Sequence, residues 1–225
     1  MKNTDLLKQL KNIAKLMQDI GTREDAKNSI NNLILDVERE TLKEDYKGKT
    51  SKQRIDYAMK WHKRQLKTIR PILAYSCKDQ IENYQVITDA YFLVFLNNDD
   101  ELPISHYTEY MNGKVNYPNT LQLYKNVEKG EEIKLDIKKV VALLNVKEDN
   151  EIRTEYNGYK LIIDKKKFNE LLVFMDVKDN SNVKILIDNQ VLKMIKNNGS
   201  KGMMVLGRTP LKENNTDFNE LLIQE

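Results

Sequence analysis

The side chains that could carry catalytic chemistry are few, and they form no recognisable catalytic set. The chain has two histidines, His62 and His106, and one cysteine, Cys77. Their spacing matches no zinc site, and the sequence contains no glycine-rich phosphate loop and no Gly-x-Ser-x-Gly nucleophile turn. These absences predict a protein that is not an enzyme and uses neither a cofactor nor a metal ion.

Acidic residues leave one enzymatic alternative open. Either the run Asp99–Glu101 or the isolated Asp89 could hold a divalent cation for a nuclease or another hydrolase. A run of carboxylates beside Asn97 and Asn98 is more typical of an exposed turn. We therefore rank a metal-dependent hydrolase as the least favoured function.

Composition indicates a water-exposed surface and a reducing compartment. The 225 residues carry a net charge of +3, and 32% of them are charged. No apolar run approaches the roughly 20 residues that span a bilayer, and the first residues lead into an amphipathic pattern rather than a secretory signal. A single cysteine, Cys77, forms no internal disulfide. The expected location is the cytoplasm, without a membrane partner.

The first part of the chain, residues 1–48, predicts a helical hairpin. Apolar residues recur at three- and four-residue spacing from Leu6 to Ile20 and again from Ala26 to Leu42. Gly21 stands where the first helix should end. The two apolar faces either pack on each other and the rest of the chain, or form a surface for self-association or a partner.

A cationic helix is expected between Lys52 and Arg70, where Pro71 ends it. One face collects four basic side chains, Lys60, Lys63, Arg64 and Lys67. Tyr57 and Trp61 flank this face. Cations beside aromatic rings suit a nucleic-acid backbone, although a solvated lysine-rich face has the same pattern. His62 falls on the apolar seam and is expected in the core.

The rest of the chain predicts strands with a few helices, and so an α+β fold. Its densest β-branched and aromatic block is Val86–Leu96, interrupted by Thr88 and Asp89. A buried carboxylate needs partners, so the chain must bend there or expose that edge; a β-bulge is the plain alternative. Further strands are expected at 132–136, 151–154, 159–163, 183–187, 191–195 and 203–206, a hairpin at 107–117, and helices at 137–144 and 165–175, capped by Asp136 and Asp164.

The order of several segments resembles the bacterial β sliding clamp, the ring-shaped processivity factor of replicative DNA polymerases. The resemblance rests on Ile69–Leu73, Val86–Leu93 and Gly113–Asn119, and on C-terminal segments at Ile162–Leu172, Asn182–Ile187, Val191–Lys196 and Gly202–Gly207. It covers about Ile69 to Pro210. The family has glycine and arginine where this chain has Ala90 and Phe92, and its closing segment also differs.

The resemblance implies antiparallel clamp-type sheets with packed helices, in two parts at 49–124 and 125–210, followed by a tail at 211–225. It implies a DNA-replication accessory that binds double-stranded DNA and the peptides of replication proteins, as a homo-oligomer. The family's peptide cleft maps by position onto Thr88, Ala90, Tyr91, Phe92, Leu93, Pro118, Leu123, Val205 and Leu206. The four cations, Lys60, Lys63, Arg64 and Lys67, suit the DNA contacts by their chemistry alone.

A second function remains open. The chain is shorter than the family's three-domain subunit, its net charge is modest, and it adds a helical hairpin. Short clamp-like proteins of this kind look like products of phages or mobile elements. The alternative is a clamp-fold interaction module, an adaptor or inhibitor of host proteins, that does not encircle DNA.

Overall fold

The computed structural model describes residues 6–8, 10–11, 13, 30, 33–34, 36–38, 40–41, 44, 50–78, 84–104, 121–146 and 150–210. The chain divides into two compact units: Met1–His62 with Leu102–Ser105, and Lys63–Glu101 with His106–Glu225. The described residues between 6 and 44 have helical backbone, but the expected hairpin as a whole lies outside the described residues. The expected strand hairpin at 107–117 and the tail at 211–225 also lie outside them.

Helix α3 (Lys52–Gln65) begins in the first unit, where Ser51 caps it by accepting a hydrogen bond from the backbone N–H of Arg54 at 3.2 Å. Its buried residues in that unit include Ile55, Ala58, Trp61 and His62. The expectation that His62 lies in the core is confirmed. The interpretation that Trp61 flanks an exposed cationic face is wrong, because the indole is fully buried on the apolar side of the helix.

The same helix ends earlier than its pattern predicts. The backbone N–H groups of Lys67 and Thr68 bond to carbonyls three residues earlier, and the Thr68 hydroxyl also donates to Gln65 O at 2.8 Å. These bonds satisfy the last carbonyls of α3 and turn the chain. Arg70 precedes a proline, which disfavours a helical backbone, and a 3-10 helix η1 (Pro71–Ala74) follows. The prediction of a helix to Arg70 is therefore wrong.

Seven antiparallel strands of the second unit form one sheet within the described residues, in the order β1-β2-β3-β9-β8-β7-β4. Their bounds are Cys77–Lys78 (β1), Gln85–Thr88 (β2), Phe92–Leu96 (β3), Glu131–Glu132 (β4), Val183–Asp188 (β7), Val191–Lys196 (β8) and Lys201–Val205 (β9). Leu93 of β3 pairs with Met203 of β9, so the sheet joins strands from both halves of the strand-rich sequence.

Both faces of the central strand β3 are covered, and all five of its residues are buried. On one face Phe92 meets Phe174 of α6 (Lys165–Met175) at 5.5 Å between ring centroids. On the other face Phe95 meets Tyr124 of α4 (Leu121–Asn126) at 5.0 Å. Burial on two sides explains why this strand is a continuous apolar run. Helix α4 was not expected from the sequence.

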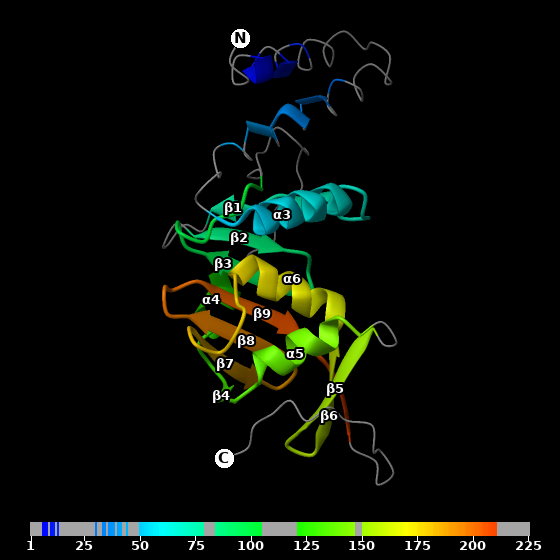
Figure 1. Ribbon diagram of the computed structural model, residues 1–225, viewed down its shortest axis with the longest axis vertical. Helices are drawn as coiled ribbons and strands as arrows, with labels where there is room; N and C mark the ends of the chain where they lie inside the picture. Colours follow the sequence, from blue (N-terminus) through cyan, green and yellow to red (C-terminus); the bar gives the residue numbers. More distant parts are fainter. Residues whose placement is uncertain are drawn as a thin grey trace. The chain divides into compact units, whose positions relative to one another are not determined.

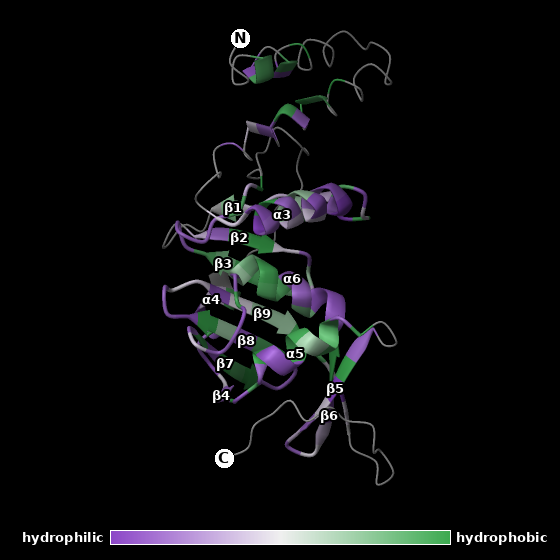
Figure 2. Ribbon diagram, viewed as in Figure 1, coloured by the Kyte–Doolittle hydropathy of each residue, from purple (hydrophilic) through white to green (hydrophobic). Residues whose placement is uncertain are grey.

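Two helices cross the sheet face that carries Phe92 (Figure 1). The predicted bounds of both are confirmed: α5 spans Ile137–Leu144 and α6 spans Lys165–Met175. Each begins at the expected cap, with Asp136 accepting from Lys139 N at 3.1 Å and Asp164 accepting from Lys167 N at 2.9 Å. Hydrophobic residues gather in the middle of α6, whereas α3 is largely hydrophilic (Figure 2).

A second, three-stranded sheet has the order β10-β6-β5 among the described residues. Strands β5 (Glu151–Tyr156) and β6 (Tyr159–Asp164) form the expected hairpin, with Asn157 and Gly158 both at positive φ. Strand β10 (Gly207–Pro210) pairs with β6, so the chain leaves the large sheet at Leu206. No helix in the described part of the chain is long and apolar enough to cross a membrane. The α+β class is confirmed.

Candidate binding pocket

The polar residues that interrupt the apolar block form a tight turn between β2 and β3. The Thr88 hydroxyl donates to Phe92 O at 2.7 Å and accepts from Ala90 N at 3.1 Å. One oxygen of the Asp89 carboxylate accepts from the N–H groups of Tyr91 and Phe92, at 2.9 and 3.0 Å. The expected bend is thus a hairpin turn that separates two regularly paired strands, and not a β-bulge.

A positive φ of 78° at Ala90 marks the centre of this turn. The left-handed region is costly for residues with a Cβ atom and free of that cost for glycine. The turn tolerates it because Thr88 and Asp89 satisfy its N–H groups. The Tyr91 carbonyl also accepts from Val205 N at 2.9 Å, which ties the turn to the end of β9.

A network of ion pairs connects the turn to α6 and to Arg64. The second oxygen of Asp89 pairs with Lys167, and Lys167 also lies 3.3 Å from Glu170, whose other oxygen pairs with Arg64. Burial alone would lower the pKa of Lys167, but the two carboxylates outweigh it and raise that pKa. The Glu170 side chain is fully buried, and this desolvation raises its pKa despite both cations. The four residues form an alternating row of charges.

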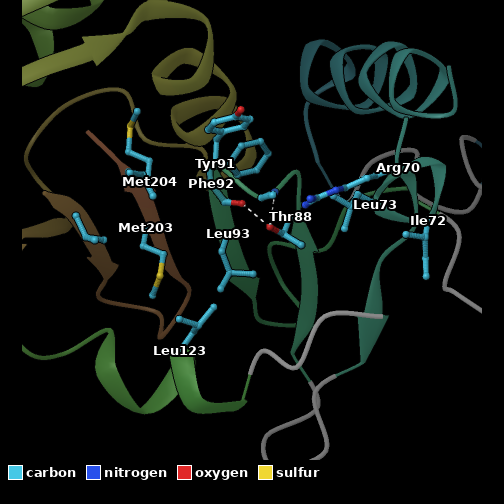
Figure 3. Close-up of a pocket in the computed structure, with 13 residues that line it drawn as sticks. Arg70, Ile72, Leu73, Thr88, Tyr91, Phe92, Leu93, Leu123, Met203 and Met204 are labelled. Carbon is cyan, nitrogen blue, oxygen red and sulfur yellow. Dashed lines mark hydrogen bonds between the residues drawn. The ribbon is translucent and has the colours of Figure 1, made fainter. Parts of the chain in front are cut away.

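A surface cavity of about 640 Å³ opens beside this turn (Figure 3). It is lined by residues of the β2–β3 turn, of β8 and β9, of α4, and of the segment that follows α3. The described lining residues are Arg70, Ile72, Leu73, Thr88, Ala90, Tyr91, Phe92, Leu93, Leu123, Val191, Met203, Met204 and Val205. We call this cavity the apolar pocket.

Seven of the nine residues expected in a peptide cleft line the apolar pocket: Thr88, Ala90, Tyr91, Phe92, Leu93, Leu123 and Val205. Leu206 is only 2% exposed and is not among its lining residues. Pro118 lies outside the described residues. Residues of the β2–β3 turn and of β9, more than a hundred positions apart in the sequence, therefore line one pocket.

Six lining residues were missed by the sequence analysis: Arg70, Ile72, Leu73, Val191, Met203 and Met204. The first three belong to the segment Ile69–Leu73, which carried part of the resemblance and could have been included. The two methionines are brought to the pocket by the pairing of β9 with β3, in which Met203 lies opposite Leu93 and Met204 lies opposite Phe92. The sequence alone does not reveal which residues of β3 and β9 pair.

The pocket is apolar at its rim as well as its base. Tyr91, Leu123 and Val205 remain 64%, 44% and 48% exposed. Arg70 is the only charged side chain among the described lining residues. Clustered exposed apolar side chains around a concavity are typical of a surface that binds another molecule.

The four cations expected to contact DNA do not share one free helical face. Lys60 and Lys63 are exposed on α3. Arg64 is exposed but pairs with Glu170, and Lys67 lies beyond the helix end at Gln65. The predicted set of four is thus divided between α3 and the segment that follows it.

The acidic run does not resemble a metal site. The Asp100 carboxylate accepts hydrogen bonds from Lys196, Ser200 and Asn198 at 2.7 to 2.9 Å. Burial opposes its ionisation, yet these bonds prevail and hold the pKa of Asp100 below its ordinary value of 3.8. Among the residues that the structure describes, no group of three or more His, Cys, Asp or Glu side chains could hold a metal ion.

The architecture is an α+β protein with an apolar pocket beside the β2–β3 turn, lined by inner strands of a helix-covered antiparallel sheet. No family model, curated protein or solved structure matches this chain.

Proposed function

We propose that this chain is a non-enzymatic binding protein whose apolar pocket takes a short segment of a partner protein. The main observation behind this proposal is the pocket itself, because three exposed apolar side chains, Tyr91, Leu123 and Val205, help to line a cavity of about 640 Å³. Covering them with a partner would contribute about 25 cal/mol for each Å² of apolar surface removed from water.

Resemblance to the sliding clamp extends the proposal to a DNA-replication accessory. Support comes from the convergence of seven cleft residues on one pocket. The backbone adds a second argument: Ala90, which has a φ of 78°, occupies the position where the family has glycine. A clamp-type partner would be a replication protein that presents an extended peptide.

DNA binding is a second candidate function, supported by the two exposed lysines on α3. Lys60 and Lys63 are three residues apart, so their side chains lie on the same side of the helix. We propose that these two lysines contact the phosphate backbone of double-stranded DNA. In this function the protein would act as a homo-oligomer in the cytoplasm. Without DNA binding, the pocket would serve the alternative, an adaptor or inhibitor of host proteins.

The pocket is tested by selecting a random peptide library, displayed on phage, against the full chain. Selected peptides are then measured against Leu123→Asp and Val205→Asp, which place a carboxylate at the rim without disturbing a buried residue. Val146→Asp is the matched control, because Val146 is 46% exposed and does not line the pocket. We expect both rim variants to lose binding by roughly tenfold or more, and the control to retain it.

An equal loss in the control, or selected peptides that bind all three variants like the wild type, would place the interaction elsewhere.

The DNA candidate is tested separately with short duplex DNA and the Lys60→Glu/Lys63→Glu variant at two salt concentrations. Contacts to phosphates predict binding that weakens with salt and with the charge reversal. Absence of binding in the wild type at low salt would remove this candidate.

A further inference from the structure

We infer that the partner segment is acidic next to its apolar side chains, and that Lys67 and Arg70 recognise these acidic residues. This inference rests on the proposed function of the apolar pocket. It assigns residues 66–70, the connector between α3 and η1, as an extension of that pocket. The connector belongs to the same compact unit as the rest of the site.

Arg70 is placed to meet an anion inside the pocket. It is exposed, lines the pocket, and extends its guanidinium group toward the side where Thr88 lies (Figure 3). It makes no ion pair with any described residue. The following residue, Pro71, fixes the backbone direction where the chain enters η1. A guanidinium group held beside apolar walls is well suited to bind a carboxylate in bidentate geometry.

Lys67 adds a second positive charge to the connector. It is exposed and, like Arg70, has no ion-pair partner among the residues that the structure describes. Three residues of chain span at most about 10 Å, so the two cations lie within reach of one short peptide. Between them, Ile69 is 97% exposed and offers a further apolar contact. The connector therefore places two cations and one exposed apolar side chain within four residues, and Arg70 at its end lines the pocket.

The two described carboxylates next to the β2–β3 turn are paired with cations. The Asp89 carboxylate is paired with Lys167, and Glu170 is paired with both Lys167 and Arg64. No carboxylate occurs among the described lining residues. Among the described residues, Lys67 and Arg70 are thus the cations at this surface without an ion-pair partner, which favours an anionic partner and disfavours a cationic one.

A protein segment suits these features better than a nucleic acid does. Affinity for a phosphate backbone grows with the number of cations that release counterions, and this surface offers two. The neighbouring walls are aliphatic and sulfur-containing, and Tyr91 has the one exposed ring among the described lining residues. Leucine or phenylalanine side chains fill such a cavity, whereas sugar and phosphate groups would lose hydration there.

The test uses two fluorescent peptides that share leucine and phenylalanine side chains and differ only in flanking aspartates or flanking lysines. Short duplex DNA is the third probe. Each is titrated against the wild type, against Lys67→Glu/Arg70→Glu, and against Lys60→Glu/Lys63→Glu. The two double variants make the same change in net charge on exposed residues, so the second controls for bulk electrostatics.

We expect the aspartate peptide to bind the wild type more tightly than the lysine peptide, and the Lys67→Glu/Arg70→Glu variant to weaken it roughly fivefold or more. The Lys60→Glu/Lys63→Glu variant should change it far less. The Lys67→Glu/Arg70→Glu variant should also reverse the preference between the two peptides. Circular dichroism of both variants must match that of the wild type.

Equal binding of the two peptides, or equal losses in the two double variants, would overturn the inference while leaving the pocket in place. DNA binding that falls more in Lys67→Glu/Arg70→Glu than in the α3 variant would make the connector a nucleic-acid site and also overturn it. If neither peptide binds and the library yields no pocket-dependent sequence, the proposed function itself fails.

Discussion

The ammonium group of Lys167 on α6 pairs with the carboxylate of Asp89 in the β2–β3 turn, 78 positions earlier in the chain. The other oxygen of that carboxylate accepts from the backbone N–H groups of Tyr91 and Phe92. One buried carboxylate thus joins a helix to the wall of the apolar pocket. Side-chain exposures of 19% for Lys167 and 2% for Asp89 place the pair largely out of water.

Replacing Lys167 by methionine should destabilise the protein by about 3 kcal/mol, because it leaves the Asp89 carboxylate buried without a counterion. Urea unfolding measures the loss. Hydrogen exchange of the Tyr91 and Phe92 amides should accelerate, since the turn loses its anchor. Lys166→Met is the control, because Lys166 is exposed on the same helix. Similar losses in both variants would contradict the anchoring role.

Ala90→Gly should stabilise the protein by up to about 1 kcal/mol, because glycine adopts the φ of 78° without the cost of a Cβ atom. The gain is partly offset by the greater entropy of glycine in the unfolded chain. The same substitution at Ala142, exposed in α5, should cost about 1 kcal/mol. Thermal unfolding of the two variants should therefore shift in opposite directions; a lower Tm for Ala90→Gly would be evidence against a strained turn.

Gly202→Ala should destabilise the protein by about 1–3 kcal/mol through overpacking. A Cβ atom at this position in β9 would overlap Met175 Sδ and lie 2.7 Å from Leu171 Cδ1, both on α6. Shortening Met175 to alanine makes room, so the double variant should lose less than the sum of the two single losses. Chemical denaturation of the three variants completes this cycle. Additive losses would mean that α6 does not approach β9 so closely.

Asp100 should give the protein stability that depends on pH. Its pKa is lowered below 3.8 in the folded state, so the unfolded chain binds the proton more readily. The contribution is complete above that value and is lost as the pH falls through the folded pKa. Asp100→Asn should cost about 1–3 kcal/mol at neutral pH, and its difference from the wild type should narrow below pH 3.8.

Urea unfolding at a series of pH values measures this difference. Asp99→Asn is the control, because the neighbouring Asp99 is exposed and should change stability by less than about 0.5 kcal/mol. A constant difference between wild type and Asp100→Asn across the acidic range would show that the hydrogen bonds from Lys196, Ser200 and Asn198 do not hold the carboxylate ionised.

Local patterns predicted the parts of the fold that local forces control. Helices α5 and α6 start at Asp136 and Asp164 because an aspartate side chain satisfies N–H groups a few residues away. The β5–β6 hairpin follows from Asn157 and Gly158, which accept positive φ. The end of α3 was misjudged because the hydroxyl of Thr68 competes for a helical carbonyl, which periodicity does not reveal.

For the candidate site, the sequence by itself predicted that the chain bends at Thr88 and Asp89, and seven of the thirteen described lining residues are among those that the resemblance implied. Only the tertiary structure decided which charges remain available. Arg64 is engaged by Glu170, 106 positions away, whereas Arg70 faces the pocket unpaired among the described residues. The physical reason is that an ion pair depends on separation in space. Sheet register and helix packing set that separation, and spacing along the chain does not.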